Sequence, residues 1–218
     1  GSSLSWSVER ENVRSLVLPP PSTGSSRVTA MIAPRSDTLR QALGLSINNA
    51  LREKVQRSDK FGNTHTRYRQ YYKDIPIWGE SITLHEDAKG NLRATGHTIK
   101  GLDQSSVARA ASASFNQSIS DPIAIAMAHK GHDTALWQTR NAQSELVIFL
   151  LDDLSPKKAY LINYFAEPTQ SSSLNSSTQQ AVLSPTRPFL MIDAETGEII
   201  KQWEGLTHLE VGTGPGGN

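Results

Sequence analysis

Hydrophobic residues follow a helical period in the segment after residue 36. They recur at intervals of three and four, as Leu39, Ala42, Leu43, Ile47, Ala50, Leu51 and Val55. Asp37 precedes them, where an N-cap side chain accepts hydrogen bonds from the first turn. The pattern predicts an amphipathic helix over 37–57. The preceding stretch, 1–35, contains Pro19-Pro20-Pro21, which fits neither a helix nor a central strand, and is predicted to be an extended arm.

The period shortens to two between residues 64 and 99, where Thr, Tyr, Ile and Trp are frequent. Turn residues interrupt this region twice, at 74–79 and at 87–91. The pattern predicts three antiparallel strands over 64–73, 77–85 and 91–99. We expect the preceding helix to cover one face of their sheet, because a small antiparallel sheet must bury its apolar side.

The second half of the chain repeats the combination of helix and strands. Residues 101–116 form either a short helix or a connector, and Ser120-Asp121-Pro122 predicts the start of a helix over 123–129. Strands are predicted over 145–152 and 158–166, and a hairpin over 188–193 and 198–204. Residues 168–185, rich in Ser, Thr, Gln and Asn, are predicted to be a mobile loop. The predicted fold is therefore α+β, with two small subdomains, each an antiparallel sheet covered by helix.

Composition narrows the classes of partner. The 218 residues include 22 Lys and Arg against 21 Asp and Glu, a net charge of +1 that gives no broad basic field for nucleic acid. The apolar runs, such as 146–151, are much shorter than the roughly 20 residues that cross a bilayer. The absence of cysteine excludes disulfides and thiolate metal ligands. We therefore predict neither a nucleic-acid nor a membrane partner.

No set of residues in the sequence has the spacing of a catalytic site. His129 and His132 would share one helical face, but no third ligand lies nearby, and an exposed helix end is the simpler interpretation. The H-E-x-x-H, G-x-S-x-G and P-loop patterns are absent. The aromatic residues Tyr68, Tyr71, Tyr72 and Trp78 either stack on bases or pack across strands, and packing is the more common use. The sequence predicts no enzyme activity, no metal and no cofactor in this chain.

Two segments carry a resemblance to a known family. Residues 67–80 read RYRQYYKDIPIWGE and resemble the fungalysin/thermolysin propeptide domain, whose pattern is R-Y-x-Q-x-Y-x-G-I-P-V-x-G. Residues 187–206 resemble the PepSY domain found in precursors of thermolysin-like zinc metalloproteases of the vibriolysin and pseudolysin branch. The tail, 214–218, is similar to the first residues of the mature enzyme there. Asp74 stands where the family usually has glycine, and aspartate tolerates the positive φ of such a turn better than most residues.

The resemblance implies a division of the chain and a role. The arm, 1–35, would precede a propeptide-like domain at 36–103, a PepSY-like domain at 104–208 and the start of the mature protease at 209–218. Propeptides of this family act as intramolecular chaperones and inhibitors of their own protease, and they are removed by autocleavage. The implied partner is the catalytic domain, held non-covalently after cleavage, which would contain zinc and calcium. The implied location is secreted, by export of a bacterial precursor through the periplasm.

The resemblance also suggests the cleavage junction. Thermolysin-like enzymes prefer a large apolar residue after the scissile bond, so we expect cleavage between His208 and Leu209, with Val211 as second choice. Thr207, His208, Leu209 and Glu210 would form the inhibitory segment. His208 either approaches the zinc or only passes through the cleft.

The remaining motif residues are expected to define the fold, with a role in the protease interface as the alternative. They are Arg67, Tyr68, Gln70, Tyr72, Pro76, Gly79, Asp193, Thr196, Gly197 and Trp203, the last expected to be a core tryptophan. A rival hypothesis is a free-standing protease inhibitor or peptide-binding module with no covalent tie to an enzyme.

Overall fold

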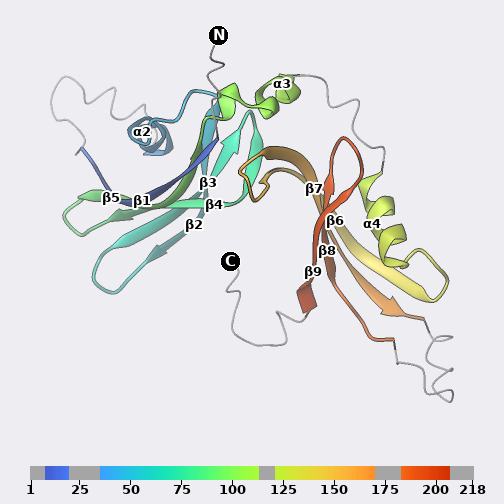
Figure 1. The fold of residues 1–218 in the computed structure, drawn as a ribbon. Helices are drawn as coiled ribbons and strands as arrows, with labels where there is room; N and C mark the ends of the chain where they lie inside the picture. The colour runs from blue at the N-terminus through green and yellow to red at the C-terminus, as the bar shows by residue number, and fades with distance from the viewer. Residues whose placement is uncertain (1–7, 20–34, 113–120, 170–182, 207–218) are drawn as a thin grey trace, which may run out of the picture. The chain divides into compact units, whose positions relative to one another are not determined.

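The computed structural model describes residues 8–19, 35–112, 121–169 and 183–206 (Figure 1). These residues are mostly strand and the helices are short, so the fold is a β-rich form of the predicted α+β class. The chain separates into two compact units, 1–114 with 148–157, and 115–147 with 158–218. None of the helices in the described ranges is long and apolar enough to span a bilayer.

The first unit contains an antiparallel sheet with strand order β1-β5-β4-β3-β2. Its strands are β1 (Glu9–Leu18), β2 (Asn49–Ser58), β3 (Thr64–Tyr72), β4 (Ile75–Glu86) and β5 (Leu92–Lys100). The three strands predicted between residues 64 and 99 are confirmed as β3, β4 and β5. Lys73 and Asp74 join β3 to β4 with φ of 46° and 67°, which is the conformation of a two-residue hairpin turn, so Asp74 does adopt a positive φ.

The predicted helix over 37–57 is wrong beyond residue 42. Helix α2 (Arg35–Ala42) ends before Gly44, whose φ is +73°, and residues 49–58 form β2 instead. Pairing with β3 buries Leu51, whereas Ile47, which the helical pattern requires on the apolar face, is 81% exposed. Strand pairing therefore outweighs a periodicity that fits both structures.

Part of the predicted arm is a strand of the sheet. β1 pairs with β5 from Glu9 opposite Lys100 to Leu18 opposite Leu92. Two of its residues, Val13 and Leu18, are buried in the core. The rest of the predicted arm, at 1–7 and 20–34, lies outside the described residues.

Helix α2 covers one face of this sheet, as expected (Figure 1). Leu39 of the helix is fully buried and packs with Tyr68, Ile82 and Leu84 of the strands. Gly96 lets β5 pass close to β4, because a Cβ there would lie 2.5 Å from the carbonyl oxygen of Ser81. The sheet therefore has one apolar face beneath α2.

The connector that follows contains short helices, which agrees with the short-helix alternative for 101–116. They are the 3₁₀ helix η1 (Leu102–Gln104) and α3 (Ser106–Ser112). The first unit also includes the end of the β6–β7 hairpin, where Ile148 pairs in parallel with Ile77 of β4. The tilted rings of Trp78 and Phe149 lie beside this pair, with centroids 5.6 Å apart.

The second unit contains helix α4 (Pro122–Lys130), strands β8 (Pro188–Asp193) and β9 (Ile199–Glu204), and most of β6 (Trp137–Leu150) and β7 (Pro156–Pro168), whose ends at 148–157 belong to the first unit. Asp121 caps α4 by accepting a hydrogen bond from the Ala124 amide at 3.0 Å, which confirms the predicted helix start. The predicted hairpin is confirmed as β8 and β9, and the strand predicted from 145 begins earlier, at Trp137. Most of the predicted loop at 168–185 lies outside the described residues.

The core of the second unit lies between α4 and the strands. Ala126 of the helix is buried with Ile162 and Tyr164 of β7 and with Leu190 and Ile192 of β8. Apolar positions at alternate residues of β7 and β8 supply this face, as the strand pattern requires.

Candidate functional site

The first motif lies on β3 and β4, and its central residues are buried. Gln70 is 1% exposed; its side-chain amide donates to Asn49 Oδ1 at 2.8 Å and to the Ile99 carbonyl at 3.0 Å. Its carbonyl oxygen accepts from the Ile99 amide at 2.9 Å, so one side chain links β3 to β2 and to β5. A buried polar side chain that satisfies several partners in this way specifies the packing around it.

The two motif tyrosines point to the same side as Gln70. Tyr68 is in the core under α2, and Tyr72 is fully buried, with its hydroxyl donating to Asp103 Oδ1 at 2.7 Å. Burial, together with the bond to Asp103, raises the pKa of Tyr72. These tyrosines contact the protein core, where no base can stack on them.

The other residues of the first motif have different surroundings. Pro76 is buried at the start of β4, and Gly79 is exposed with φ of +83° and no atom within 4 Å of a Cβ position. Gly79 is therefore needed for its backbone conformation and not for space. Arg67 lies on the opposite face from Tyr68, half-buried, and its Nε atom is buried without a hydrogen-bond partner among the described residues.

The second motif forms the turn between β8 and β9. Asp193 Oδ1 accepts from the amides of Glu195 at 2.8 Å and Thr196 at 3.1 Å, and the Thr196 hydroxyl accepts from the Glu198 amide at 3.2 Å. Gly197 has φ of +79°. This is the turn that the sequence suggests, in which an aspartate side chain replaces missing backbone partners.

Trp203 is not the core residue that was expected. It is half-buried on β9 and stacks on Phe189 of β8, with ring centroids 5.3 Å apart and planes inclined by 9°. Cross-strand partners share one face of a hairpin, which explains why the two rings meet.

A set of contacts that the sequence did not indicate fixes the end of β9. The Glu204 carboxylate accepts from the backbone amides of Arg187 at 2.8 Å and Leu206 at 2.9 Å, and from the Thr186 hydroxyl. Burial alone would raise the pKa of Glu204, but the hydrogen bonds from Thr186, Arg187 and Leu206 hold it below its usual range. We call Thr186, Arg187, Glu204, Gly205 and Leu206 the exit clamp.

Gly205 completes the exit clamp. Its amide donates to the Arg187 carbonyl at 2.8 Å, and a Cβ at this position would lie 2.3 Å from Cε2 of Phe189. Only glycine fits under that ring. The predicted junction residues Thr207, His208, Leu209 and Glu210 follow directly and lie outside the described residues.

The two histidines at the end of α4 contact different groups. His129 Nε2 lies 3.4 Å from the side-chain nitrogen of Gln202, and His132 Nδ1 lies 2.7 Å from the Tyr164 hydroxyl. His132 is buried, so the interpretation of both histidines as an exposed helix end is wrong for this residue. Within the described ranges, no three His, Asp or Glu side chains gather closely enough to hold a metal ion.

Another pair of histidines lies across β3 and β4. The Nδ1 atoms of His65 and His85 are 2.7 Å apart, and the outer nitrogens contact Asp59 at 3.2 Å and Thr95 at 2.8 Å. Burial, the neighbouring His65 and Arg93 lower the pKa of His85. Sequence reasoning missed this pair, although the register of a predicted hairpin places both residues on one face.

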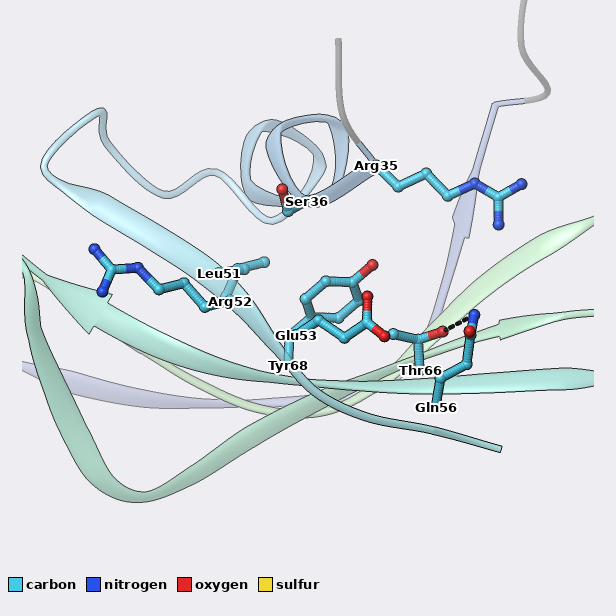
Figure 2. Close-up of a pocket in the computed structure, with 8 residues that line it drawn as sticks. All are labelled: Arg35, Ser36, Leu51, Arg52, Glu53, Gln56, Thr66 and Tyr68. Carbon is cyan, nitrogen blue, oxygen red and sulfur yellow. Dashed lines mark hydrogen bonds between the residues drawn. The ribbon is translucent and has the colours of Figure 1, made fainter. Parts of the chain in front are cut away.

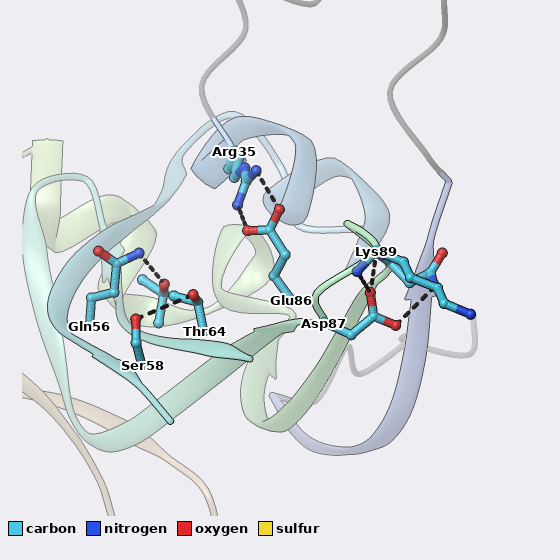
Figure 3. A network of polar contacts seen from close by, with 9 residues as sticks. Arg35, Gln56, Ser58, Thr64, Glu86, Asp87 and Lys89 are labelled. Carbon is cyan, nitrogen blue, oxygen red and sulfur yellow. Dashed lines mark hydrogen bonds and ion pairs between the residues drawn. The ribbon is translucent and has the colours of Figure 1, made fainter. Parts of the chain in front are cut away.

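A pocket of about 450 Å³ opens between the first turn of α2 and strands β2 and β3 (Figure 2). It is lined by Arg35, Ser36, Leu51, Arg52, Glu53, Gln56, Thr66 and Tyr68. Both guanidinium nitrogens of Arg35 pair with Glu86, one of them at 2.9 Å, and this pair ties α2 to the end of β4 (Figure 3). The bond to Glu86 raises the pKa of Arg35, and the bond to Arg35 lowers the pKa of Glu86. The sequence did not predict this pocket, because residues 49–58, which form β2 beside it, were assigned to the helix over 37–57.

Comparison with known proteins supplies the family. The model of the fungalysin/thermolysin propeptide motif matches residues 49–99, from the start of β2 almost to the end of β5. The hemagglutinin/proteinase of Vibrio cholerae is 30% identical over 160 residues, covering 72% of this chain and 23% of that protein. The neutral protease of Vibrio proteolyticus is 30% identical over 159 residues, covering 72% and 24%.

More distant proteins were also found. Thermolysin of Alicyclobacillus acidocaldarius is 26% identical over 165 residues, covering 73% of this chain and 26% of that protein. The Bacillus megaterium YpeB C-terminal domain aligns over 85% of this chain and 68% of its own with 11% identity, and its TM-score of 0.30 is too low to show a shared fold. The chain spans about a quarter of the length of the curated relatives it matches. Residues 49–99 carry the fungalysin/thermolysin propeptide motif, and together with the protease relatives this match supports a propeptide of a thermolysin-like protease.

Proposed function

We propose that this chain is an intramolecular chaperone and inhibitor of its cognate thermolysin-like zinc metalloprotease. The observation that carries the proposal is the propeptide motif over β2 to β5, in a chain related to several metalloproteases. A pro-region supplies binding surface and not chemistry, so it needs no catalytic residues of its own. Its partner is the catalytic domain, which would contain the zinc and calcium.

We propose the chain divisions that the resemblance implies. The propeptide-like domain occupies 36–103 and the PepSY-like domain 104–208, with the mature enzyme beginning at 209. The presence of a helix and a sheet in each compact unit supports two subdomains, and the turn at Asp193 supports the PepSY-like assignment. Secretion of the precursor through the periplasm follows from the same proposal.

The proposed cleavage is between His208 and Leu209. The exit clamp supports this position because it holds Leu206, and the proposed bond begins within two residues of Leu206. After cleavage, 207–210 would stay in the cleft while the units hold the catalytic domain non-covalently. An interface of roughly 1,200–2,000 Å² is sufficient for a stable complex of this kind.

The chaperone role is a statement about folding kinetics. A partner that binds the folding transition state of the protease more tightly than its unfolded state lowers the barrier, by the same differential binding that governs catalysis. Refolding of the unfolded mature protease should therefore be faster and more complete when this chain is present in trans. Serum albumin at the same concentration is the control, and equal refolding in both samples would contradict the chaperone role.

Inhibition and processing have separate tests. Titration of the chain into mature protease should abolish cleavage of a peptide substrate at about one equivalent, and unchanged activity would contradict the inhibitor role. Mass spectrometry of the processed precursor should give a mature N-terminus at Leu209. A mature N-terminus at Val211 or elsewhere would show that the proposed junction between His208 and Leu209 is wrong.

A further inference from the structure

One face of the sheet in the first unit collects arginines from three strands. Directly opposite residues of paired strands share a face, and the register places Arg52 opposite Arg69 and His65 opposite both Arg57 and His85. His85 in turn lies opposite Arg93 on β5. Arg67 lies two residues from both His65 and Arg69, so it shares this face. We call Arg52, Arg57, Arg67, Arg69 and Arg93 the arginine face.

The arginine face points away from α2. The neighbouring residues Tyr68, Leu84 and Ala94 alternate with it along the strands and are buried beneath the helix. Arg52, Arg57 and Arg93 are exposed, and Arg67 and Arg69 are half-buried. The charge is therefore presented at the surface of the first unit.

Acidic side chains compensate only part of this charge. Asp74 Oδ1 lies 2.8 Å from Arg52 with its side chain 89% exposed, and Asp59 Oδ2 lies 3.2 Å from His65. Among the residues that the structure describes, no carboxylate comes within ion-pair distance of Arg57, Arg67 or Arg93. Because the whole chain has a net charge of only +1, this positive excess is local.

Two guanidinium groups of the arginine face lie over the same aromatic ring. Arg52 Cζ lies 4.1 Å and Arg69 Cζ 5.9 Å from the centroid of Tyr71. Stacking restricts a guanidinium, and the N–H edge of Arg52 already holds one carboxylate, that of Asp74 at 2.8 Å. Arg67 adds a donor, Nε, that is buried without a partner among the described residues, and an unmade bond of this kind is costly.

The histidine pair lies inside the arginine face and adds no negative charge to it. One proton shared between the two Nδ1 atoms satisfies the 2.7 Å contact without an ionised imidazole. The groups that face the pair are Asp59, Thr95, Arg57 and Arg93.

We propose that the arginine face docks an acidic surface of the protease catalytic domain. This inference rests on the proposed function and specifies which face of the first unit meets the enzyme and by what chemistry. Polypeptide carboxylates fit the face better than nucleic acid does, because Asp59 and Asp74 would repel a continuous phosphate backbone. The Tyr71 ring, which a base would need for stacking, is already covered by Arg52.

The test uses a double variant, Arg57→Gln/Arg93→Gln, which removes two exposed charges that make no ion pair with described residues. The matched control, Lys89→Gln/Lys201→Gln, removes two exposed charges elsewhere. Binding to the cognate mature protease is measured by surface plasmon resonance at 50 and 500 mM NaCl. We expect the arginine variant to bind about tenfold more weakly at the lower salt, mainly through slower association, and the control to change by less than about twofold. At the higher salt the difference should largely disappear.

The outcomes separate this inference from the proposed function. A wild-type chain that neither binds nor inhibits the protease contradicts the proposed function, and the inference with it. Tight wild-type binding that the arginine variant retains, with the same salt dependence, overturns only the inference. Binding of a single-stranded oligonucleotide in competition with the protease would show that the partner class is wrong. Urea unfolding of each variant should match wild type, which excludes misfolding as the cause.

Discussion

Gln70 in the first compact unit and His132 in the second are buried polar side chains, and they are satisfied in different ways. Gln70 of the first unit makes three hydrogen bonds, to Asn49 and to both backbone groups of Ile99. His132 of the second unit contacts the hydroxyl of Tyr164 at 2.7 Å. An amide does not titrate, whereas burial and the nearby Lys130 lower the pKa of His132. The hydrogen bonds of Gln70, which we call the first link, are therefore independent of pH. The contact between His132 and Tyr164, which we call the second link, depends on the protonation state of the imidazole.

The largest effect should come from making the first link titratable. Gln70→Glu at pH 7 places a carboxylate in a buried site built for an amide and loses the donors to Asn49 and Ile99. We expect a loss of about 4 kcal/mol in the free energy of unfolding, measured in urea. Burial raises the pKa of the new carboxyl, so lowering the pH to 5 should recover part of the loss. A variant equally stable at both pH values would contradict the buried placement of this side chain.

Removing the first link without adding charge should cost less. Gln70→Leu leaves the amide and carbonyl of Ile99 and the Asn49 side chain without their partner, and we expect a loss of about 3 kcal/mol. Gln56→Leu is the matched control, because Gln56 is exposed and makes one hydrogen bond, to Thr66 at 3.2 Å. The control should change stability by less than about 0.5 kcal/mol. Similar losses of stability in both variants would mean that the hydrogen bonds of Gln70 contribute no more than those of an exposed glutamine.

The link in the second unit should be weaker. Tyr164→Phe keeps the ring in the core and removes the hydroxyl that His132 contacts, with an expected loss of about 1–2 kcal/mol. Hydrogen exchange followed by mass spectrometry locates the effect, since faster exchange should be confined to the second unit. Uniform acceleration over both units would show that they unfold together.

The smallest effect should be the pH dependence of the wild-type link. Because the folded-state pKa of His132 lies below the unfolded value, the unfolded chain binds the proton first as pH falls below about 6.5. The second unit should therefore lose stability between pH 6.5 and the lower folded-state pKa, and regain it above. His85 of the first unit has a lowered pKa as well, so the measurement is made in a His85→Gln background. In that background, hydrogen exchange that depends on pH in the first unit but not in the second would contradict the assignment of the pH-dependent link to His132.

Local signals in the sequence predicted a large part of the fold. The turns at Asp74 and Asp193, the cap at Asp121 and the alternation along β3 to β5 depend on neighbouring residues, and all are found in the structure. The helix over 37–57 failed because its apolar spacing also suits a short helix followed by an edge strand. The choice between them depends on pairing with β3, which lies far along the chain.

The sites were harder to predict than the fold. Gln70 was identified through the family resemblance, but its bonds to Ile99 join residues 29 apart in sequence. The exit clamp depends on Glu204 reaching the amide of Arg187, and the arginine face depends on the register of four strands. Such contacts are decided by strand order, which a single sequence does not display. The proposed junction at 207–210 remains a prediction from the sequence, because it lies outside the described residues.

The exit clamp limits the distance between the folded second unit and the proposed cleavage site. An extended chain advances at most about 3.6 Å per residue, so the proposed scissile bond begins no more than about 7 Å beyond Leu206. A protease that cuts there must bring its cleft up to the end of β9, and a catalytic domain joined to the same chain reaches this position at a far higher effective concentration than a free one. Folding of the second unit would then determine both when and where the precursor is cut, because the exit clamp forms only when the β8–β9 hairpin is folded.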